Sequence, residues 1–444
     1  MDWTKNFKRL PYFIDFFYEK TTTSIAFYPT LFAIFSIFLT ALMLFLEEKG
    51  LTGWVAEHAP GFLMIKSWDV AESVLTMMVG ALISLMVFSF SMVMVLLNNA
   101  ASNYSPRILP SLIANKFHQV VLGTYLGSIT YSLLLIINLT PTQSDTTVPS
   151  ISVLLAIFFG LHCLMIFVFF IHSISEAVQV GKILESLSSI TEKKMENGMI
   201  SKLINEPAPD TRSWKVYKSD RSGYLKAINC EIISKLCIEH ELKIKVLIAT
   251  RTFVVNKIDL FCCDKALEED LQNKILEQFR FSENEVAEDD HAIGFKQINE
   301  IALKAMSPGI NDPGTALYAI NHLAILFDKK MERKDAEAFP IKNEKNEVVS
   351  VRLWLTITDF EELLCHTLAS LRTYARHDMM VLLRMLDMLK FLIKQDSTGT
   401  DYKKVIRLEI EKIRMDAKEH LTNPEDYKKI VESIDLMKKE RQGA

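Results

Sequence analysis

The sequence predicts a mainly α membrane protein, in which four transmembrane helices precede a cytoplasmic α+β region made of a small β-barrel-like unit plus a helical domain. Four apolar runs near the N-terminus each have about the 20 residues that cross a bilayer. Short β-like runs and long amphipathic helices follow them. The apolar runs are residues 26–46, 70–97, 120–139 and 151–171. Because lipid cannot hydrogen-bond a bare backbone, each run must be helical.

The chain divides into five predicted parts. They are an interfacial amphipathic segment (residues 1–25), a four-helix transmembrane domain (26–173), a helical stalk (174–212), a small β-rich domain (213–265) and a mostly helical cytoplasmic domain (266–444). The first part alternates aromatic residues with Lys and Arg, which is typical of a segment that lies in the membrane interface. No small-x-small cleavage site follows Leu46, so we expect the first apolar run to be retained rather than removed with a signal peptide.

Lys and Arg in the short loops predict that both termini are cytoplasmic, because basic loops stay on that side of the membrane. Basic residues occur before the first span, between the second and third spans and after the fourth, whereas residues 140–150 contain none. The loop of residues 47–69 contains Lys49 and Lys66 together with three glutamates, so it contributes little to the orientation.

The second apolar run differs from the others because its small and polar residues recur at helical spacing. They are Thr76, Gly80, Ser84, Ser91, Asn98, Ser102 and Ser105, and they form one stripe that extends beyond the apolar stretch. A helix of about 35 residues would be near 50 Å long, so we expect its end to protrude into the cytoplasm. Two functions fit the stripe: close packing of helices, or a water-lined path for ions when several subunits contribute this helix.

Small residues in the third apolar run favour helix packing. Gly123 and Gly127 form a GxxxG pair, which usually marks a surface where two helices meet. In the fourth run, we expect His162 to bond a neighbouring helix rather than to carry protons. No Asp, Glu, Lys or Arg lies deep in any of the four runs, which disfavours a proton- or sodium-coupled transporter.

After the fourth run, the sequence predicts that the same helix continues as a charged stalk to Asn205. Short β-like runs then predict a small, partly open barrel over residues 214–264, with one helix near residues 228–240. Beyond the barrel the pattern is mostly helical, with one strand-like run at residues 348–358.

A long predicted helix over residues 361–392 is one candidate ligand site. Its charged residues, which could form an anion pocket, are Arg372, Arg376, His377, Asp378 and Arg384. Solvated helix faces explain such charges equally well.

A second candidate is the motif between two predicted helices at residues 295–306 and 314–327. It consists of Ser307, Pro308, Gly309, Ile310, Asn311, Asp312 and Pro313. Its composition is that of a turn: Gly309 permits positive φ, Asp312 can cap the next helix and Pro313 suits the first helical position. The N–H groups at that helix start could also hold an anion, but Asp312 would compete for them.

The composition excludes several classes of protein. A formal net charge of -4 without a basic aromatic patch gives no support for nucleic acid binding. The six cysteines contain no CxxC pair, and five lie in the part assigned to the reducing cytoplasm, so we expect free thiols and neither disulfides nor a zinc site. No Walker loop, HExxH, GxSxG or dinucleotide fingerprint is present. The sequence therefore predicts no enzyme, no metal and no cofactor.

Three stretches of the sequence resemble a known family. They are Asn103-Tyr104-Ser105-Pro106-Arg107 followed by residues 119–124, Ser222-Gly223-Tyr224-Leu225, and the motif of residues 307–313 with Ala316 after it. In this order they resemble the bacterial predicted membrane proteins of domain-of-unknown-function family 2254, over nearly the whole chain. Where family members often read Gln-Asp-Pro before a Phe-Gly pair, this chain has Glu288-Asp289-Asp290-His291 and then Gly294-Phe295. The resemblance implies a location in the bacterial inner membrane and this domain layout, and it implies no established activity.

These observations lead to a hypothesis and an alternative. The hypothesis is a homo-oligomeric ion channel or pore lined by the second transmembrane helix, with the cytoplasmic region as its gate. The alternative is a non-conducting membrane receptor or scaffold that assembles through the same polar stripe. The expected partners are the lipid bilayer, ions and further copies of the chain, and not nucleic acid.

Overall fold

The computed structural model describes residues 26–56, 65, 67–103, 116–138, 148–177, 179–283, 290–333, 335–342, 347–395 and 402–439. The chain forms two compact units, Met1–Gln179 and Val180–Ala444. The predicted interfacial segment of residues 1–25 lies outside the described residues, as does Ser105.

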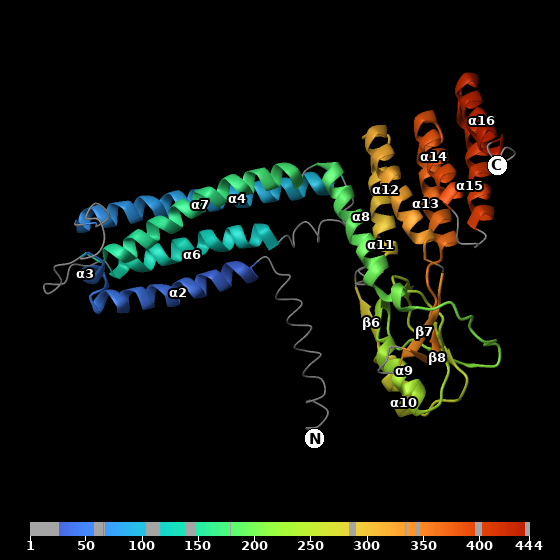
Figure 1. Ribbon diagram of the computed structural model, residues 1–444, viewed down its shortest axis with the longest axis horizontal. Coiled ribbons are helices and arrows are strands. Elements are labelled where there is room, and N and C mark those ends of the chain that lie inside the picture. Colours follow the sequence, from blue (N-terminus) through green and yellow to red (C-terminus); the bar gives the residue numbers. More distant parts are fainter. Residues whose placement is uncertain are drawn as a thin grey trace. The chain divides into compact units, whose positions relative to one another are not determined.

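Within its described residues, the first unit contains four long helices and a short one. The long helices are α2 (Phe27–Glu48), α4 (Trp68–Asn103), α6 (Lys116–Asn138) and α7 (Ser150–Ala177), and the short one is α3 (Leu51–Ala56). Each long helix has the length and the apolar composition needed to cross a membrane. This confirms the four helices predicted from the apolar runs. The most buried of them is α6, which packs against α2, α4 and α7 (Figure 1).

Two glycines of α6 let α2 approach closely. A Cβ built at Gly123 would lie 3.1 Å from the Phe32 ring, and one built at Gly127 would lie 2.9 Å from the Ser36 hydroxyl oxygen. Larger side chains at either position would push α2 away, so the GxxxG pair lies where α2 and α6 meet. Ser36 and Thr40, two polar residues of α2, are both buried.

The second unit begins with α8 (Val180–Asn197), which is a separate helix and not a continuation of α7. Ile183, Leu184 and Leu187 share one face of α8 and are buried. This helix packs against α11 (Ala292–Ala305) and α12 (Pro313–Met331). The predicted charged stalk to Asn205 is therefore corrected to a packed helix, because its apolar face finds partners within the second unit. A 3₁₀ turn, η3 (Met199–Lys202), follows it.

Short strands form two sheets in the described part of the second unit. The strands are β1 (Lys215–Lys218), β2 (Gly223–Ile228), β3 (Ile244–Val246), β4 (Phe253–Val254), β5 (Asp259–Cys263), β6 (Phe279–Ser282), β7 (Ala338–Lys342) and β8 (Val348–Trp354). The sheet orders are β1-β5-β3-β8-β7 and β4-β2-β6. Both sheets share one core that includes Leu225, Phe261, Phe279 and Leu353. The region predicted as a partly open barrel is thus a pair of sheets on a common core.

The five-stranded sheet contains two strands from far along the chain. These strands, β7 and β8, come from the part predicted to be mostly helical, and β8 lies in the strand-like run predicted at residues 348–358. Parallel pairing places Ile244 of β3 opposite Leu353 of β8. Parallel strands need a long crossover connection, and here the crossover contains α11 and α12. Strands and helices therefore fold together as one unit.

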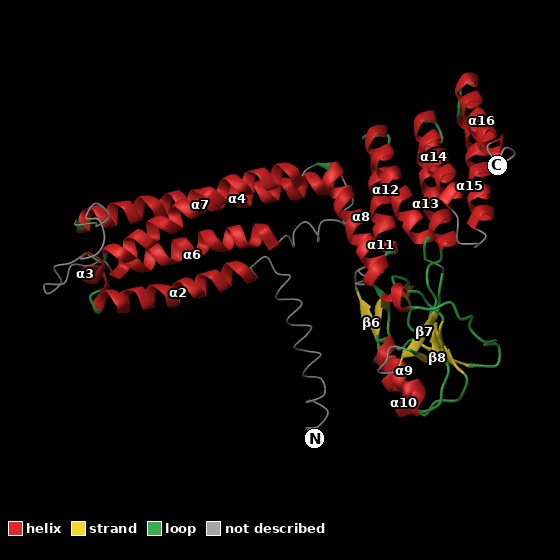
Figure 2. Ribbon diagram, viewed as in Figure 1, coloured by secondary structure: helices red, strands yellow, loops and turns green. Residues whose placement is uncertain are grey.

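The remaining helices of this unit are α9 (Cys230–Glu239), α10 (Glu269–Leu276), α13 (Phe360–Ala375), α14 (Met379–Gln395), α15 (Tyr402–His420) and α16 (Pro424–Lys439). Figure 2 shows the strands gathered at one end of the array formed by α11 to α16. The prediction of a single helix over residues 361–392 is wrong, because α13 and α14 are separate helices. The Asp378 carboxylate accepts a hydrogen bond from the Val381 N–H at 3.0 Å, so it caps the start of α14.

The motif of residues 307–313 forms the turn between α11 and α12. Asp312 caps α12: its carboxylate accepts from the Thr315 hydroxyl at 2.6 Å and from the Thr315 N–H at 3.1 Å. These hydrogen bonds lower the pKa of Asp312. Positive φ occurs at Asn311 (47°) and not at Gly309, which corrects the role predicted for that glycine. Asn tolerates the left-handed region better than most residues.

Replacing Gly294 by Ala is expected to destabilise the second unit by about 1–3 kcal/mol, because it overpacks the contact between α8 and α11. A Cβ at Gly294 would overlap the Thr191 hydroxyl of α8 and lie 2.7 Å from Thr191 Cβ. Thr191 is buried and its hydroxyl donates to Leu187 O at 2.6 Å, so it has little freedom to move. Urea unfolding of the full chain would measure the change.

The fluorescence of Trp214 and Trp354 reports on this unit once the three other tryptophans of the chain (Trp3, Trp54 and Trp68) are replaced by Phe. Gly309→Ala is the matched control, because a Cβ there would meet nothing within 4 Å. Equal stability changes for the two variants would contradict the packing assigned to Gly294.

Candidate functional site

The polar stripe of α4 lies on the side of that helix that faces away from the rest of the first unit. The residues Thr76, Gly80, Ser84, Ser91 and Asn98 are all exposed. The opposite side of the helix is buried and contains Ala71, Leu75, Val79, Leu82, Ser89 and Leu96. The structure thus brings five of the seven predicted stripe residues onto one exposed face. The Ser102 side chain and Ser105 lie outside the described residues.

This face of α4 has three further properties. Ser73, which the sequence-based prediction missed, is exposed one turn earlier and extends the stripe, whereas the exposed Val87 interrupts it. Ser84 donates its hydroxyl hydrogen to Gly80 O, and Ser91 donates to Val87 O, both at 2.9 Å. These hydroxyls are therefore satisfied within their own helix. Nothing lies within 4 Å of a Cβ built at Gly80, so the helix surface is open there.

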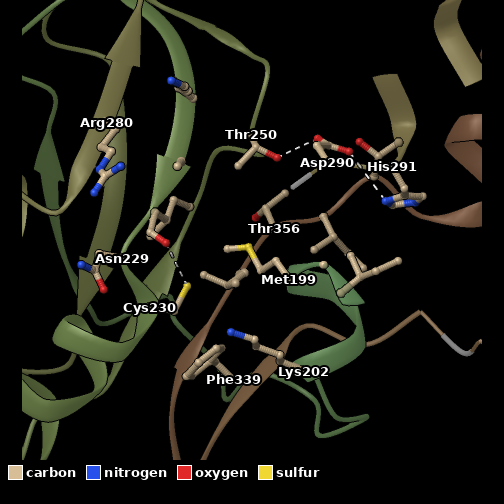
Figure 3. Close-up of a pocket in the computed structure, with 18 of the residues that line it drawn as sticks. Met199, Lys202, Asn229, Cys230, Thr250, Arg280, Asp290, His291, Phe339 and Thr356 are labelled. Carbon is tan, nitrogen blue, oxygen red and sulfur yellow. Dashed lines mark hydrogen bonds and ion pairs between the residues drawn. The ribbon is translucent and has the colours of Figure 1, made fainter. Parts of the chain in front are cut away.

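The second unit contains a pocket of about 330 Å³. Seven separate parts of the chain line it: residues 197–202 around η3, residues 226–231 at the end of β2 and the start of α9, Thr250, Arg280 of β6, residues 290–291 before α11, Phe339 of β7 and residues 355–358 after β8. In the close-up of Figure 3, Met199 lies among the labelled side chains, with Arg280 and Asn229 on one side and Asp290 and His291 on the other. A volume of roughly 300–1,000 Å³ is typical of small-molecule sites.

The lining of this pocket combines apolar and charged side chains. The apolar side chains include Met199, Ile228, Phe339, Leu355 and Ile357. The charged ones are Lys202, Lys226 and Arg280 with Glu231 and Asp290. Lys202 Nζ lies 3.6 Å from the Glu231 carboxylate, and both side chains are largely exposed.

Asp290 belongs to a buried ion pair at the edge of the pocket. Its Oδ2 accepts from Arg251 Nε at 2.8 Å and from the Thr250 hydroxyl at 2.7 Å, and its Oδ1 accepts from the Ala292 N–H at 2.9 Å. Burial alone would raise the pKa of Asp290, but the charge of Arg251 and these hydrogen bonds hold the pKa below its ordinary value. Asp290 is therefore ionised, and its charge is already compensated.

His291 is the buried titratable group beside this pair. Its side chain is 3% exposed, and neither ring nitrogen has a hydrogen-bond partner. Burial lowers the pKa of His291 to about 4, against the opposing effect of the Asp290 carboxylate. The imidazole is therefore neutral near pH 7. A neutral imidazole has one N–H donor and one nitrogen acceptor, and both are unused at the pocket wall.

Three of the five residues predicted to form an anion pocket on α13 and α14, namely Arg372, Arg376 and His377, contact α15 instead. Arg372 Nε lies 3.6 Å from the Asp416 carboxylate and 4.0 Å from that of the fully buried Glu409. Arg376 Nη1 lies 3.3 Å from His420 Nε2. Acidic and polar groups of α15 occupy the positions that an anion would take. The contacts therefore hold the helices together rather than form an anion site.

The motif of residues 307–313 contributes no residue to the pocket lining. The Asp312 carboxylate accepts a hydrogen bond from the Thr315 N–H at the start of α12. It therefore occupies a donor that an anion would need, as the sequence analysis anticipated. Across the parts of the chain that the structure describes, no three His, Cys, Asp or Glu side chains come together as a metal site would require.

Four candidate spans followed by a unit of strands and helices define the class of the protein, a membrane protein. The chain belongs to the family described as "Predicted membrane protein (DUF2254)", whose sequence profile matches residues 22–390. This confirms the resemblance noted in the sequence.

The chain is similar to uncharacterized proteins of Mycobacterium bovis and Mycobacterium tuberculosis, with 21% identity over 331 residues in both cases. Each match covers 72% of this chain and 63% of the relative, so the chain spans less than two thirds of the length of these relatives. No solved structure matches the chain.

Proposed function

We propose that the protein is a homo-oligomeric ion channel or pore of the bacterial inner membrane, in which α4 of several copies lines the path. In this proposal both termini and the second unit are cytoplasmic, the second unit is the gate, and the chain catalyses no reaction. The observation that supports it is the exposed polar stripe of α4. Polar groups cost free energy in hydrocarbon, so this face is expected to meet water or another copy of the chain.

The spacing of the stripe suits a bundle of several copies. Ser84, Ser91 and Asn98 recur every seven residues, which keeps them on one seam when helices coil around each other. In such a bundle, hydroxyl and amide groups would form successive rings of neutral, weak sites, and weak sites let an ion both enter and leave.

A non-conducting receptor or scaffold is the second candidate, and one observation favours it. The hydroxyls of Ser84 and Ser91 are bonded to carbonyl groups of their own helix, so they need no water. Such a face can pack against a neighbouring helix, especially near the open surface at Gly80.

Ion flux is expected to disappear when Ser91 or Asn98 is replaced by Leu, because an apolar ring dewets a narrow path. The measurement is flux through the purified full chain in liposomes, with different salts, and cross-linking of the same samples to count subunits. His162→Leu is the matched control, since His162 is an exposed polar residue on α7.

Oligomers that show no flux in any salt would contradict the pore and favour the scaffold. A monomer in the membrane would exclude both. Single cysteines along residues 76–98 give an independent readout: thiol labelling from water at every seventh residue supports the pore, whereas protection of the whole segment contradicts it.

A further inference from the structure

The pocket of the second unit is a cavity that conduction through α4 does not use. Seven separate parts of the chain line it, so it forms only when the whole unit folds. Its volume of about 330 Å³ lies at the small end of the range for small-molecule sites. The pocket therefore suits a small ligand of one or two rings.

The charged side chains of the lining already have partners within the chain. Lys202 lies 3.6 Å from the Glu231 carboxylate, and Asp290 belongs to a buried ion pair. Lys226 and Arg280 each interact with another group of the chain as well. Among the described residues that line the pocket, no charged group is thus left over for a ligand. A charged ligand would have to compete with these existing partners, so the lining favours an uncharged one.

Two uncharged polar side chains of the lining still have groups to offer. Neither ring nitrogen of His291 has a hydrogen-bond partner, although its side chain is only 3% exposed and an unsatisfied buried polar group is costly. Asn229 uses its side-chain oxygen to accept from the Ile232 N–H at 3.3 Å, and its NH₂ group donates to no described residue. In Figure 3 the two side chains lie on opposite sides of Met199. A molecule with a polar group at each end could therefore meet both.

The apolar part of the lining favours a flat aromatic ring between those polar ends. It includes Met199, Phe339 and Leu355. A methionine thioether adapts its shape and makes favourable contacts with aromatic rings, and a phenyl ring does the same through offset or edge-on packing.

We propose that this pocket binds a small, uncharged, planar heterocycle with a polar group at each end, such as a ring nitrogen and a carboxamide. His291 forms a hydrogen bond with one end, Asn229 donates to the other, and Met199, Phe339 and Leu355 pack against the ring. An uncharged ligand binds in the same way whatever the charges of residues 284–289, which lie outside the described residues. This proposal does not depend on conduction through α4.

Isothermal titration calorimetry of the full chain in detergent micelles tests it with two matched pairs of probes. The pairs are nicotinamide with benzamide, and quinazolinone with isoquinolinone, and the members of each pair differ by one ring nitrogen. In at least one pair, the compound with the extra nitrogen is expected to bind about fivefold more tightly, as one hydrogen bond between neutral groups provides.

Two further measurements test whether the ligand is uncharged. Nicotinate, the anionic counterpart of nicotinamide, is expected to bind no more tightly than nicotinamide. An increase in KCl from about 50 mM to about 500 mM is expected to change the affinity of the uncharged probes less than about twofold, because salt screens only the interactions of charges.

His291→Phe is expected to remove the difference between the two members of the pair, because it keeps a flat ring and removes both ring nitrogens. His291→Gln, which keeps a donor and an acceptor, is expected to retain part of the difference. His240→Phe is the matched control, since His240 is exposed and lies outside the pocket lining. Binding curves are compared only for variants that unfold at the wild-type temperature.

Four results would overturn the proposal. They are binding of neither nicotinamide nor quinazolinone at about 10 mM, equal binding within both pairs, tighter binding of nicotinate than of nicotinamide, and a difference within a pair that persists in His291→Phe. Ion flux measured on the same protein separates this failure from a failure of the pore, because the two readouts involve different units.

Discussion

Asp290→Ala is expected to lower the free energy of unfolding of the second unit by about 3–5 kcal/mol, because it leaves Arg251 charged and buried without its partner. The two side chains are only 15% and 11% exposed, so water cannot replace the lost carboxylate. The substitution also removes the acceptor for the Thr250 hydroxyl and the Ala292 N–H. Arg251 itself has a positive φ of 71°, a conformation that non-glycine residues adopt only when their surroundings hold them there.

Urea unfolding of the full chain, followed through Trp214 and Trp354 with the other tryptophans replaced by Phe, measures this effect. Asp210→Ala is the control, because Asp210 pairs with Arg212 at a highly exposed position, and such a change is usually within about 0.5 kcal/mol. The double substitution Arg251→Met with Asp290→Leu is expected to recover most of the loss, since it buries no unpaired charge. If Asp290→Ala behaves like the surface control, the ion pair does not stabilise this unit.

The first unit could be predicted from sequence because the bilayer imposes a length and a composition on every helix that crosses it. The helical period also identified the stripe of α4, and the exposed Thr76, Ser84 and Asn98 follow it. Two helix ends were less predictable, the end of α7 and the end of α13, because the helical pattern of the sequence continues across both. For the second of these, Asp378 before the apolar run of α14 was a usable capping signal.

The pocket could not be predicted because no local pattern connects its parts. The parallel pairing of β3 with β8 brings residues 355–358 into the same pocket as residues 197–202 and 226–231. The spacing of residues in the sequence does not reveal the register of that pairing. Asp290 and His291 follow an acidic stretch that reads as a solvated loop. Only the burial of the pair, with Arg251 as its counter-charge, distinguishes it from such a loop.

The free energy of unfolding of the second unit is expected to fall by about 2 kcal/mol between pH 7 and pH 5 because of His291 alone. Burial lowers the pKa of His291 to about 4 in the folded chain, from 6.5 in an exposed histidine. Above pH 6.5 the imidazole is neutral in both states, so its contribution to stability is complete. As the pH falls below 6.5, the unfolded chain takes up a proton that the folded chain does not, and stability decreases until the pH reaches about 4.

Urea unfolding at pH 7, pH 6 and pH 5 tests this, and His291→Gln is the informative variant because it cannot take up the proton. Its stability at pH 7 is expected to differ from that of the wild type, but its pH dependence should be flatter by about 2 kcal/mol over the same interval. His240→Gln, at an exposed position, should keep the wild-type dependence. Titration of Asp290 does not affect this comparison, because its pKa lies below the ordinary 3.8. The stability that ionised Asp290 contributes is therefore lost only at lower pH. A His291→Gln variant with the unchanged wild-type slope would contradict the assignment, because the imidazole would then be hydrated in the folded protein and its pKa would not be lowered by burial.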